Sequence, residues 1–244
     1  MKKIILDLDT GIDDTLAMSY VLASEDAELI GITGTYGNVL LETGVANDLN
    51  LLSMFGREDI PVFKGVPHPS NATNFEVPSS SGIFHGKNGT GNVDIPTCST
   101  RKVEETSAVD FIIDCARKYG KDELVYVPTG PSTNIDAAFA KAPDIIDNIT
   151  IVMMGGSLTQ PGNCNPFMEA NISMDPEASN RLFATSADIT MIGLDVTMQA
   201  LLTKKETQQL RDTGTKAGAF LADMTDYYID ISEQEDPAFQ GGCN

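Results

Sequence analysis

The chain has few basic residues and no long apolar run. Its 244 residues include 16 Lys and Arg against 35 Asp and Glu, which gives a formal net charge of -19 at pH 7. Such a charge repels phosphate backbones and anionic lipid surfaces, so we predict that neither nucleic acid nor a membrane is a partner. The apolar run that follows Lys2 and Lys3 is interrupted at Asp7, which makes it too short for a signal peptide or a membrane span.

Cysteines are also few, and they are scattered. Cys98, Cys115, Cys164 and Cys243 include no CxxC pair. A disulfide framework or a zinc site is therefore not expected. With no leader peptide recognised, this pattern favours a cytoplasmic location.

Short aliphatic runs alternate along the chain with longer helix-like segments. Strands are expected at 2–8, 27–37, 60–65, 123–130, 149–157 and 188–196, and helices at 13–24, 41–56, 107–120, 134–143 and 175–186. This alternation predicts an α/β fold, a Rossmann-like and mostly parallel open sheet with helices on both faces, in a single domain. From residue 203 we expect two helical segments and then a polar, Gly-rich end. Residues 66–100 lack periodicity and are rich in Pro, Ser, Asn, Gly and Thr, which predicts a long loop of the kind that often lines an active site.

Polar side chains follow several of the predicted strands. In a parallel sheet, ligands bind beyond the carboxyl ends of the strands, so these residues are expected to converge there. They are the aspartates from Asp7 to Asp14, then Asn38, Thr129, Asn163, Glu169 and Asn171. No Lys, Arg or phosphate-binding loop lies among them, and the set therefore fits a cation and a polyhydroxyl ligand better than a phosphate.

The segment "IILDLDTGIDDT", residues 4–15, carries four aspartates between Asp7 and Asp14. Clustered carboxylates raise one another's pKa unless a cation lies among them. Ca²⁺ suits such a cluster, since it takes roughly 6–8 oxygen ligands. Alternatively, Asp13 could cap the first helix with Asp14 in its first turn, but capping leaves Asp7 and Asp9 unexplained.

Several motifs resemble those of one enzyme family. "DLDTGIDD" resembles the DxDxGxDD signature of the nucleoside hydrolases, the inosine–uridine-preferring ribohydrolases. "GNV" at Gly37, "HGKNGTGNV" at His85, "PTGPSTNIDAA" around Thr129, "MGGS" at Met154 and "GNCNPFMEANISMDPEAS" up to Ser179 follow in family order. Together these motifs extend over almost the whole chain, which makes the resemblance specific.

The resemblance implies hydrolysis of the N-glycosidic bond of purine or pyrimidine ribonucleosides by a calcium-bound water. It implies Asp9 as general base and metal ligand, with Asp14 and the main-chain carbonyl of Thr129 as further ligands. Asp7 would support the site. Substrate contacts are implied for Asp13, Asn38, His85, Met154, Asn163, Glu169, Asn171 and Tyr228, of which His85 and Tyr228 would lie near the nucleobase. The family also suggests a homo-oligomer, a dimer or a tetramer.

One departure from the family lies at the end of the chain. Family members continue a Gly-rich segment like "FQGGCN" into a His–Asp pair, whereas this sequence stops at Asn244. We therefore interpret residues 1–244 as a C-terminally incomplete nucleoside-hydrolase-like domain, in which Ca²⁺ would find only about three or four protein oxygens. Two alternatives stay open: an impaired ribose- or nucleoside-binding remnant, and a haloacid-dehalogenase-like phosphatase. The phosphatase is disfavoured because Thr10 and Gly11 follow Asp9 in the wrong order.

Overall fold

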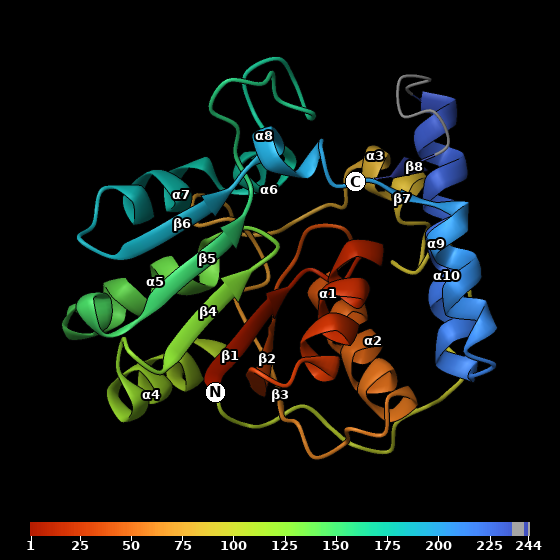
Figure 1. The fold of residues 1–244 in the computed structure, drawn as a ribbon. Coiled ribbons are helices and arrows are strands. Elements are labelled where there is room, and N and C mark those ends of the chain that lie inside the picture. The colour runs from red at the N-terminus through yellow and green to blue at the C-terminus, as the bar shows by residue number, and fades with distance from the viewer. Residues whose placement is uncertain (236–241, 244) are drawn as a thin grey trace.

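Six parallel strands form the central sheet of the computed structural model, which describes residues 1–235, 242 and 243 (Figure 1). Their order across the sheet is β3-β2-β1-β4-β5-β6. The strands are β1 (Lys2–Leu8), β2 (Ala27–Gly34), β3 (Val62–Lys64), β4 (Leu124–Pro128), β5 (Thr150–Met154) and β6 (Asp188–Ile192). The order reverses between β1 and β4, which is the point where such sheets bind their ligands. The predicted Rossmann-like fold is confirmed.

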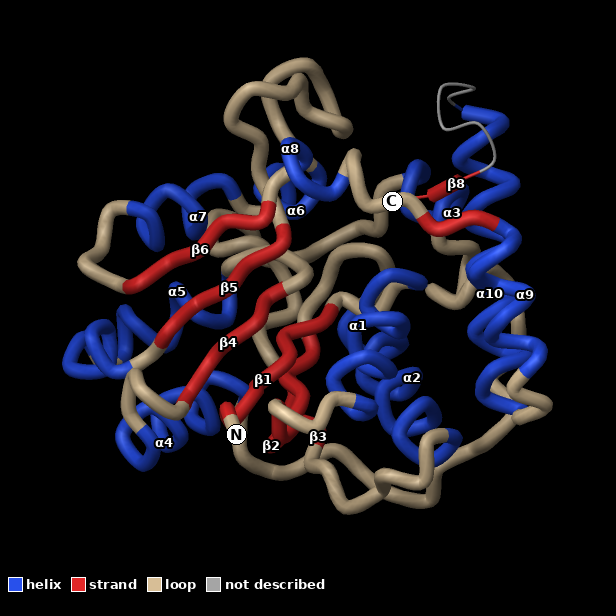
Figure 2. Tube along the Cα trace, viewed as in Figure 1, coloured by secondary structure: helices blue, strands red, loops and turns tan. Residues whose placement is uncertain are grey.

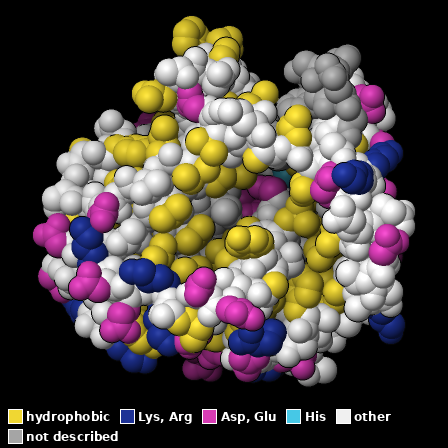
Figure 3. Space-filling model, viewed as in Figure 1, with side chains coloured by type: hydrophobic (Ala, Val, Ile, Leu, Met, Phe, Trp, Pro, Cys, Tyr) yellow, Lys and Arg dark blue, Asp and Glu magenta, His cyan; other side chains and the backbone are white. Residues whose placement is uncertain are grey.

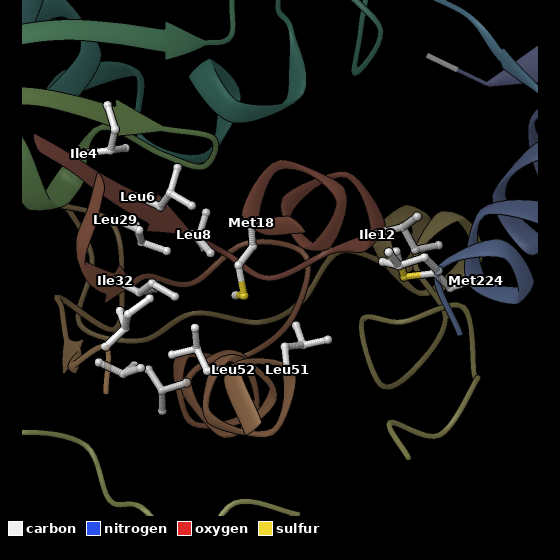
Figure 4. Close-up of a cluster of buried hydrophobic side chains, with 14 of the residues drawn as sticks. Ile4, Leu6, Leu8, Ile12, Met18, Leu29, Ile32, Leu51, Leu52 and Met224 are labelled. Carbon is white, nitrogen blue, oxygen red and sulfur yellow. The ribbon is translucent and has the colours of Figure 1, made fainter. Parts of the chain in front are cut away.

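Helices cover both faces of this sheet, as the continuous apolar run of β1 requires. Ile4, Leu6 and Leu8 point into one buried cluster and Ile5 into the other, because successive side chains of a strand face opposite sides. Figure 4 shows the first cluster between the sheet, α1 and α2. The helices on that side are α1 (Ile12–Ala23) and α2 (Leu41–Met54); those on the other are α4 (Ala108–Tyr119), α5 (Thr133–Lys141) and α7 (Pro176–Phe183).

The last part of the described chain packs outside α1. As predicted, it contains two helices, α9 (Lys204–Asp212) and α10 (Lys216–Glu235). Met224 of α10 lies against Ile12 at the start of α1 (Figure 4). A short antiparallel pair that was not expected, β7 (Leu202–Thr203) with β8 (Gly242–Cys243), lies beside α10 (Figure 2). Most of the expected Gly-rich end, 236–241 and 244, lies outside the described residues.

Short helices account for most differences from the predicted elements. The stretch 66–100 contains α3 (Ser79–Phe84), and the strand expected at 188–196 ends at Ile192 because α8 (Leu194–Thr197) follows. The 3₁₀ helix η1 (Pro143–Asn148) and α6 (Ala170–Met174) were also missed. Helices of one or two turns are too short for a 3.6-residue apolar period to show in the sequence. Across 1–235, no helix is both long and apolar enough to cross a membrane.

Candidate active site

The acidic loop and Thr129 meet at the carboxyl ends of β1 and β4. These strands are neighbours, with Asp7 paired in register with Pro128. The Thr129 amide donates to the Asp7 carbonyl over 3.0 Å, and the Thr129 hydroxyl donates to Asp14 Oδ1. The side chains of Asp14 and Thr129 are thus brought together across the point where the strand order reverses.

Helix α1 begins directly after the loop, and its N-cap is Gly11. The Gly11 amide donates to Asp14 Oδ2 over 2.5 Å, and Asp14 is the third residue of the helix. The expectation that Asp13 caps the helix is wrong, since the chain already turns into α1 two residues earlier. Capping therefore explains the orientation of Asp14 but not the presence of Asp7, Asp9 and Asp13.

Asp9 is buried between two glycines. Its Oδ2 accepts the Asn38 amide over 2.7 Å. A Cβ added at Gly37 would lie 2.0 Å from Asp9 Oδ2, and one at Gly130 would lie 3.0 Å from Asp9 Oδ1. Among the described residues, Oδ1 has no hydrogen-bond partner although it is buried. One oxygen of Asp9 is thus fixed by the backbone, while the other has no donor in the described part of the chain.

Asp7 lies deeper, within the sheet. Its Oδ1 accepts the Thr33 hydroxyl over 2.5 Å and the Asn134 amide over 2.7 Å. Burial raises the Asp7 pKa to about 6, although both hydrogen bonds act to lower it. These hydrogen bonds hold Asp7 in place at the start of the acidic loop, so its contacts suit a supporting role.

Burial raises the pKa of every other acid in the loop, and the charges of neighbouring acids add to the effect. The Asp14 pKa rises to about 7 through burial and the charge of Asp13, and the Asp13 pKa rises to about 6 mainly through burial. Burial, followed by the charges of Asp14 and Asp13, also raises the pKa of Asp9 well above its ordinary value. Within the described part of the chain, no Lys or Arg forms an ion pair with these three. The loop therefore holds negative charge that no Lys or Arg among the described residues neutralises.

The raised pKa values predict how the metal-free protein responds to pH. Asp7 and Asp13, with pKa about 6, and Asp14, with pKa about 7, bind protons in the folded chain that they have lost in the unfolded chain. The free energy of unfolding should therefore rise as the pH falls from about 8 to 6.5. Below 6.5 His85 opposes this trend, since its pKa of about 4 lies under its ordinary value.

Urea unfolding in the presence of a chelator at both ends of this pH range measures the effect. Asp14→Asn is the matched variant and should show a smaller pH slope than the wild type. A free energy of unfolding that is flat, or that rises with pH, would contradict the burial of these acids in ionisable form.

His85 lies beside the loop as a neutral imidazole. Its Nδ1 accepts the Ile12 amide over 3.2 Å, which places the ring proton on Nε2. Burial lowers the His85 pKa to about 4. The ring lies 3.7 Å from Asp13 Oδ1, and its centroid is 5.5 Å from that of the Tyr228 ring. A Cβ at Gly11 would meet His85, Asn38 and Asp13 within 2.6–3.0 Å, so these three side chains converge above the loop.

A pocket opens over this site. Figure 3 shows a depression with acidic and histidine side chains visible inside it, between the upper loops and the C-terminal helices. The lining residues come from the loop, the β5 and β6 ends, α8 and α10: Asp13, Met154, Gly155, Asn163, Glu169, Ile192, Gly193, Leu194, Thr197 and Tyr228. Five of the residues predicted to bind substrate thus share one pocket: Asp13, Met154, Asn163, Glu169 and Tyr228.

Glu169 and Asn171 fix the wall of this pocket. Glu169 caps α6, accepting the Asn171 amide over 2.9 Å, the Ile172 amide over 3.1 Å and the Gly156 amide over 2.8 Å. Asn171 Nδ2 donates to the carbonyl oxygens of Thr129, over 2.8 Å, and of Met154, over 3.1 Å. The wall is therefore bonded directly to the residue that follows β4.

Asn163 is the least enclosed of the predicted residues. It is exposed on the segment between β5 and α6, which rises above the sheet edge in Figure 2, and its Oδ1 accepts the Ala170 amide over 2.9 Å. The sequence interpretation missed the wall formed by Leu194 and Thr197. Their position directly after the sixth strand was the signal that could have identified them.

Comparisons with known proteins show the family of this chain. The family described as "Inosine-uridine preferring nucleoside hydrolase" matches residues 4–244. The inosine-uridine preferring nucleoside hydrolase of Leishmania major is 37% identical over 235 residues, which are 96% of this chain and 73% of that protein. The probable uridine nucleosidase 2 of Arabidopsis thaliana is 37% identical over 232 residues, 94% of this chain and 70% of that protein.

A solved structure, the purine-preferring ribonucleoside hydrolase from Gardnerella vaginalis, is similar with a TM-score of 0.96 and 60% identity, over 99% of this chain and 76% of that chain. Fold and site together define the class as a glycosidase built on a Rossmann-like sheet. Within that class, the chain belongs to the nucleoside hydrolase family, whose enzymes hydrolyse ribonucleosides. This membership sets the phosphatase alternative aside.

Proposed function

We propose that this chain hydrolyses the N-glycosidic bond of purine and pyrimidine ribonucleosides, with Asp9 as general base in a calcium-dependent site. The observation that carries the proposal is the Asp9 carboxylate, buried at the switch point with one oxygen lacking a donor among the described residues, in the same loop as Asp13, which lines the pocket. A raised pKa brings a carboxylate closer to the range in which it accepts protons efficiently near neutral pH. Asp9 would take the proton of the attacking water.

The proposed metal ligands are Asp9, Asp14 and the Thr129 carbonyl. In favour of this set, Asp9 and Asp14 are buried acids, the charge of Asp14 raises the pKa of Asp9, and the Thr129 carbonyl has a lone pair beyond the one that accepts Asn171. Among the residues that the structure describes, no three His, Cys, Asp or Glu side chains form a metal-binding group; the proposed set needs only two carboxylates. Bound Ca²⁺ would neutralise these acids and lower the pKa of a coordinated water.

The remaining residues are proposed to hold the substrate. Asp13, Asn38, Asn163, Glu169 and Asn171 would bind the ribose hydroxyls, and Met154 would pack beside them. Breaking the C1′–N bond builds positive charge on the sugar, as in glycoside hydrolysis. Carboxylate and amide oxygens around the ribose would stabilise that charge in a buried site.

His85 and Tyr228 are proposed to contact the nucleobase. The tilted pair of rings, 5.5 Å between centroids, offers an apolar and aromatic surface next to Asp13. Neutral His85 Nε2 carries the ring proton, since Nδ1 is used as an acceptor. That proton could be donated in a hydrogen bond to a base nitrogen.

Release of free ribose from inosine and from uridine tests the proposed function. The wild-type chain, with Ca²⁺ present, should release ribose and free base in equal amounts. Inosine is the first substrate to test, because the 60% identical hydrolase from Gardnerella vaginalis is named as purine-preferring. If nucleosides bind but no ribose appears, the proposal is wrong and the chain acts as a binding remnant. The homo-oligomer and the cytoplasmic location stay predictions from the sequence.

A further inference from the structure

Thr10 stands in the middle of the acidic loop with an unusual backbone. Its φ is +30°, in the left-handed region that β-branched residues rarely adopt, and the residue is fully buried. Asp9 precedes it, and Gly11, the N-cap of α1, follows it. The turn at Thr10 therefore sets the direction of Asp9 relative to the helix that carries Asp13 and Asp14.

Helix α2 holds this turn through Asp48. The Thr10 hydroxyl donates to Asp48 Oδ1 over 2.9 Å, and both side chains have no solvent exposure. Among the described residues, Asp48 Oδ2 has no hydrogen-bond partner. A buried acid with an unpaired oxygen costs stability compared with an apolar residue in the same place, so its presence calls for a role.

Helix α2 also holds a second segment of the site. Asn47 Nδ2 donates to the Asn88 carbonyl over 2.7 Å. A Cβ at Gly89 would lie 2.5 Å from the Thr10 carbonyl oxygen, and one at Gly44 would lie 3.4 Å from Thr10 Oγ1. The turn at Thr10 is therefore enclosed between α2 and the segment that continues from His85.

We propose that Thr10 and Asp48 are a pair of positioning residues, which fixes the acidic loop so that Asp9 and the start of α1 keep the geometry that turnover requires. The proposal rests on the function proposed above. Neither residue touches the substrate. Asp48 holds the Thr10 hydroxyl, and that hydroxyl maintains the turn that directs Asp9 toward the Asn38 amide. A displacement of about 1 Å in a catalytic group can cost on the order of 100-fold in rate.

Two pairs of variants test this proposal. Asp48→Asn and Thr10→Ser keep the acceptor and the hydroxyl, and should keep most of the wild-type kcat for ribose release from inosine. Asp48→Leu and Thr10→Ala remove them, and should lower kcat by about 100-fold with a much smaller change in KM. Because the residues act through one hydrogen bond, the Asp48→Leu/Thr10→Ala double variant should lose little more than either single variant.

A partly buried Thr–Asp pair elsewhere in the chain provides the control. The Thr207 hydroxyl of α9 donates to Asp226 Oδ1 of α10 over 2.6 Å, and Thr207 is buried. Thr207→Val should lower the unfolding temperature and leave kcat unchanged. If Asp48→Leu or Thr10→Ala behaves like Thr207→Val, the pair only stabilises the fold and the proposal is overturned.

The test still gives an answer if one variant fails to fold or if the wild type is inactive. Should Asp48→Leu fail to fold, the comparison of Thr10→Ala with Thr10→Ser decides by itself, since these variants differ only in the hydroxyl. Failure of the proposed function has a different signature, because the wild type would then release no ribose at all. An active wild type with fully active Thr10→Ala overturns the positioning role alone.

Discussion

Asp9→Asn should lower kcat for ribose release by about 10²–10⁴-fold, the range that loss of a general base produces. The change is isosteric, and an amide oxygen can still accept the Asn38 amide over the 2.7 Å now spanned by Asp9 Oδ2. It removes the proton acceptor and one unit of negative charge from the proposed metal site. Measured at saturating inosine and Ca²⁺, the loss should appear mainly in kcat.

The same variant should fold at least as well as the wild type. Asp9 is buried, and the charges of Asp14 and Asp13 raise its pKa, so a neutral side chain relieves repulsion. Asp144→Asn is a suitable control, since Asp144 is exposed and pairs with Arg117 away from the site. A near-normal kcat in Asp9→Asn would exclude Asp9 from the proposed role, whatever its stability.

2′-Deoxyinosine should be a very poor substrate compared with inosine. A site built to bond a substrate hydroxyl rejects the analogue that lacks it by about 10⁴–10⁵ in kcat/KM, because its buried polar groups are left unpaired. Asp13 Oδ1 is one such group, a buried oxygen on the wall of the pocket with no hydrogen-bond partner among the described residues. The ratio of kcat/KM for inosine to that for 2′-deoxyinosine measures the effect.

A variant of Asp13 tests which residue of the site distinguishes inosine from 2′-deoxyinosine. Asp13 lines the pocket and has one buried oxygen without a hydrogen-bond partner among the described residues. In Asp13→Ala, the preference for inosine should shrink, since the variant lacks a partner that bonds the hydroxyl of inosine and that the deoxy analogue never used. A wild-type kcat/KM ratio below about ten would show that buried groups of the site do not hydrogen-bond to the ribose hydroxyls.

Much of the site could be predicted from the sequence because its residues lie directly after the carboxyl ends of predicted strands. The carboxyl ends of neighbouring parallel strands meet at one edge, so the Asp7–Asp14 loop and Thr129 were expected together, and the Asp14–Thr129 hydrogen bond joins them. The continuous apolar run Ile4, Ile5 and Leu6 likewise indicated a strand that is buried on both faces.

Contacts made across long sequence separations could not be predicted. His85 is 73 residues from the Ile12 amide that it accepts, and Thr10 is 38 residues from Asp48. No local pattern specifies such pairs, since each depends on how α2 and the long loop pack against β1. Helix α8 was missed for a different reason. Its residues continue the apolar pattern of the preceding strand, so the sequence predicted one longer strand.

The dependence of ribose release on metal tests the central claim most directly. Ribose release from inosine should be measured with Ca²⁺, after exhaustive chelation, and after return of Ca²⁺ or Mg²⁺. The account predicts that activity is lost on chelation and returns with Ca²⁺, and that Mg²⁺ is the poorer replacement because it demands a tighter octahedral set of ligands. Full activity in chelated protein, with no metal detected by elemental analysis, would contradict it.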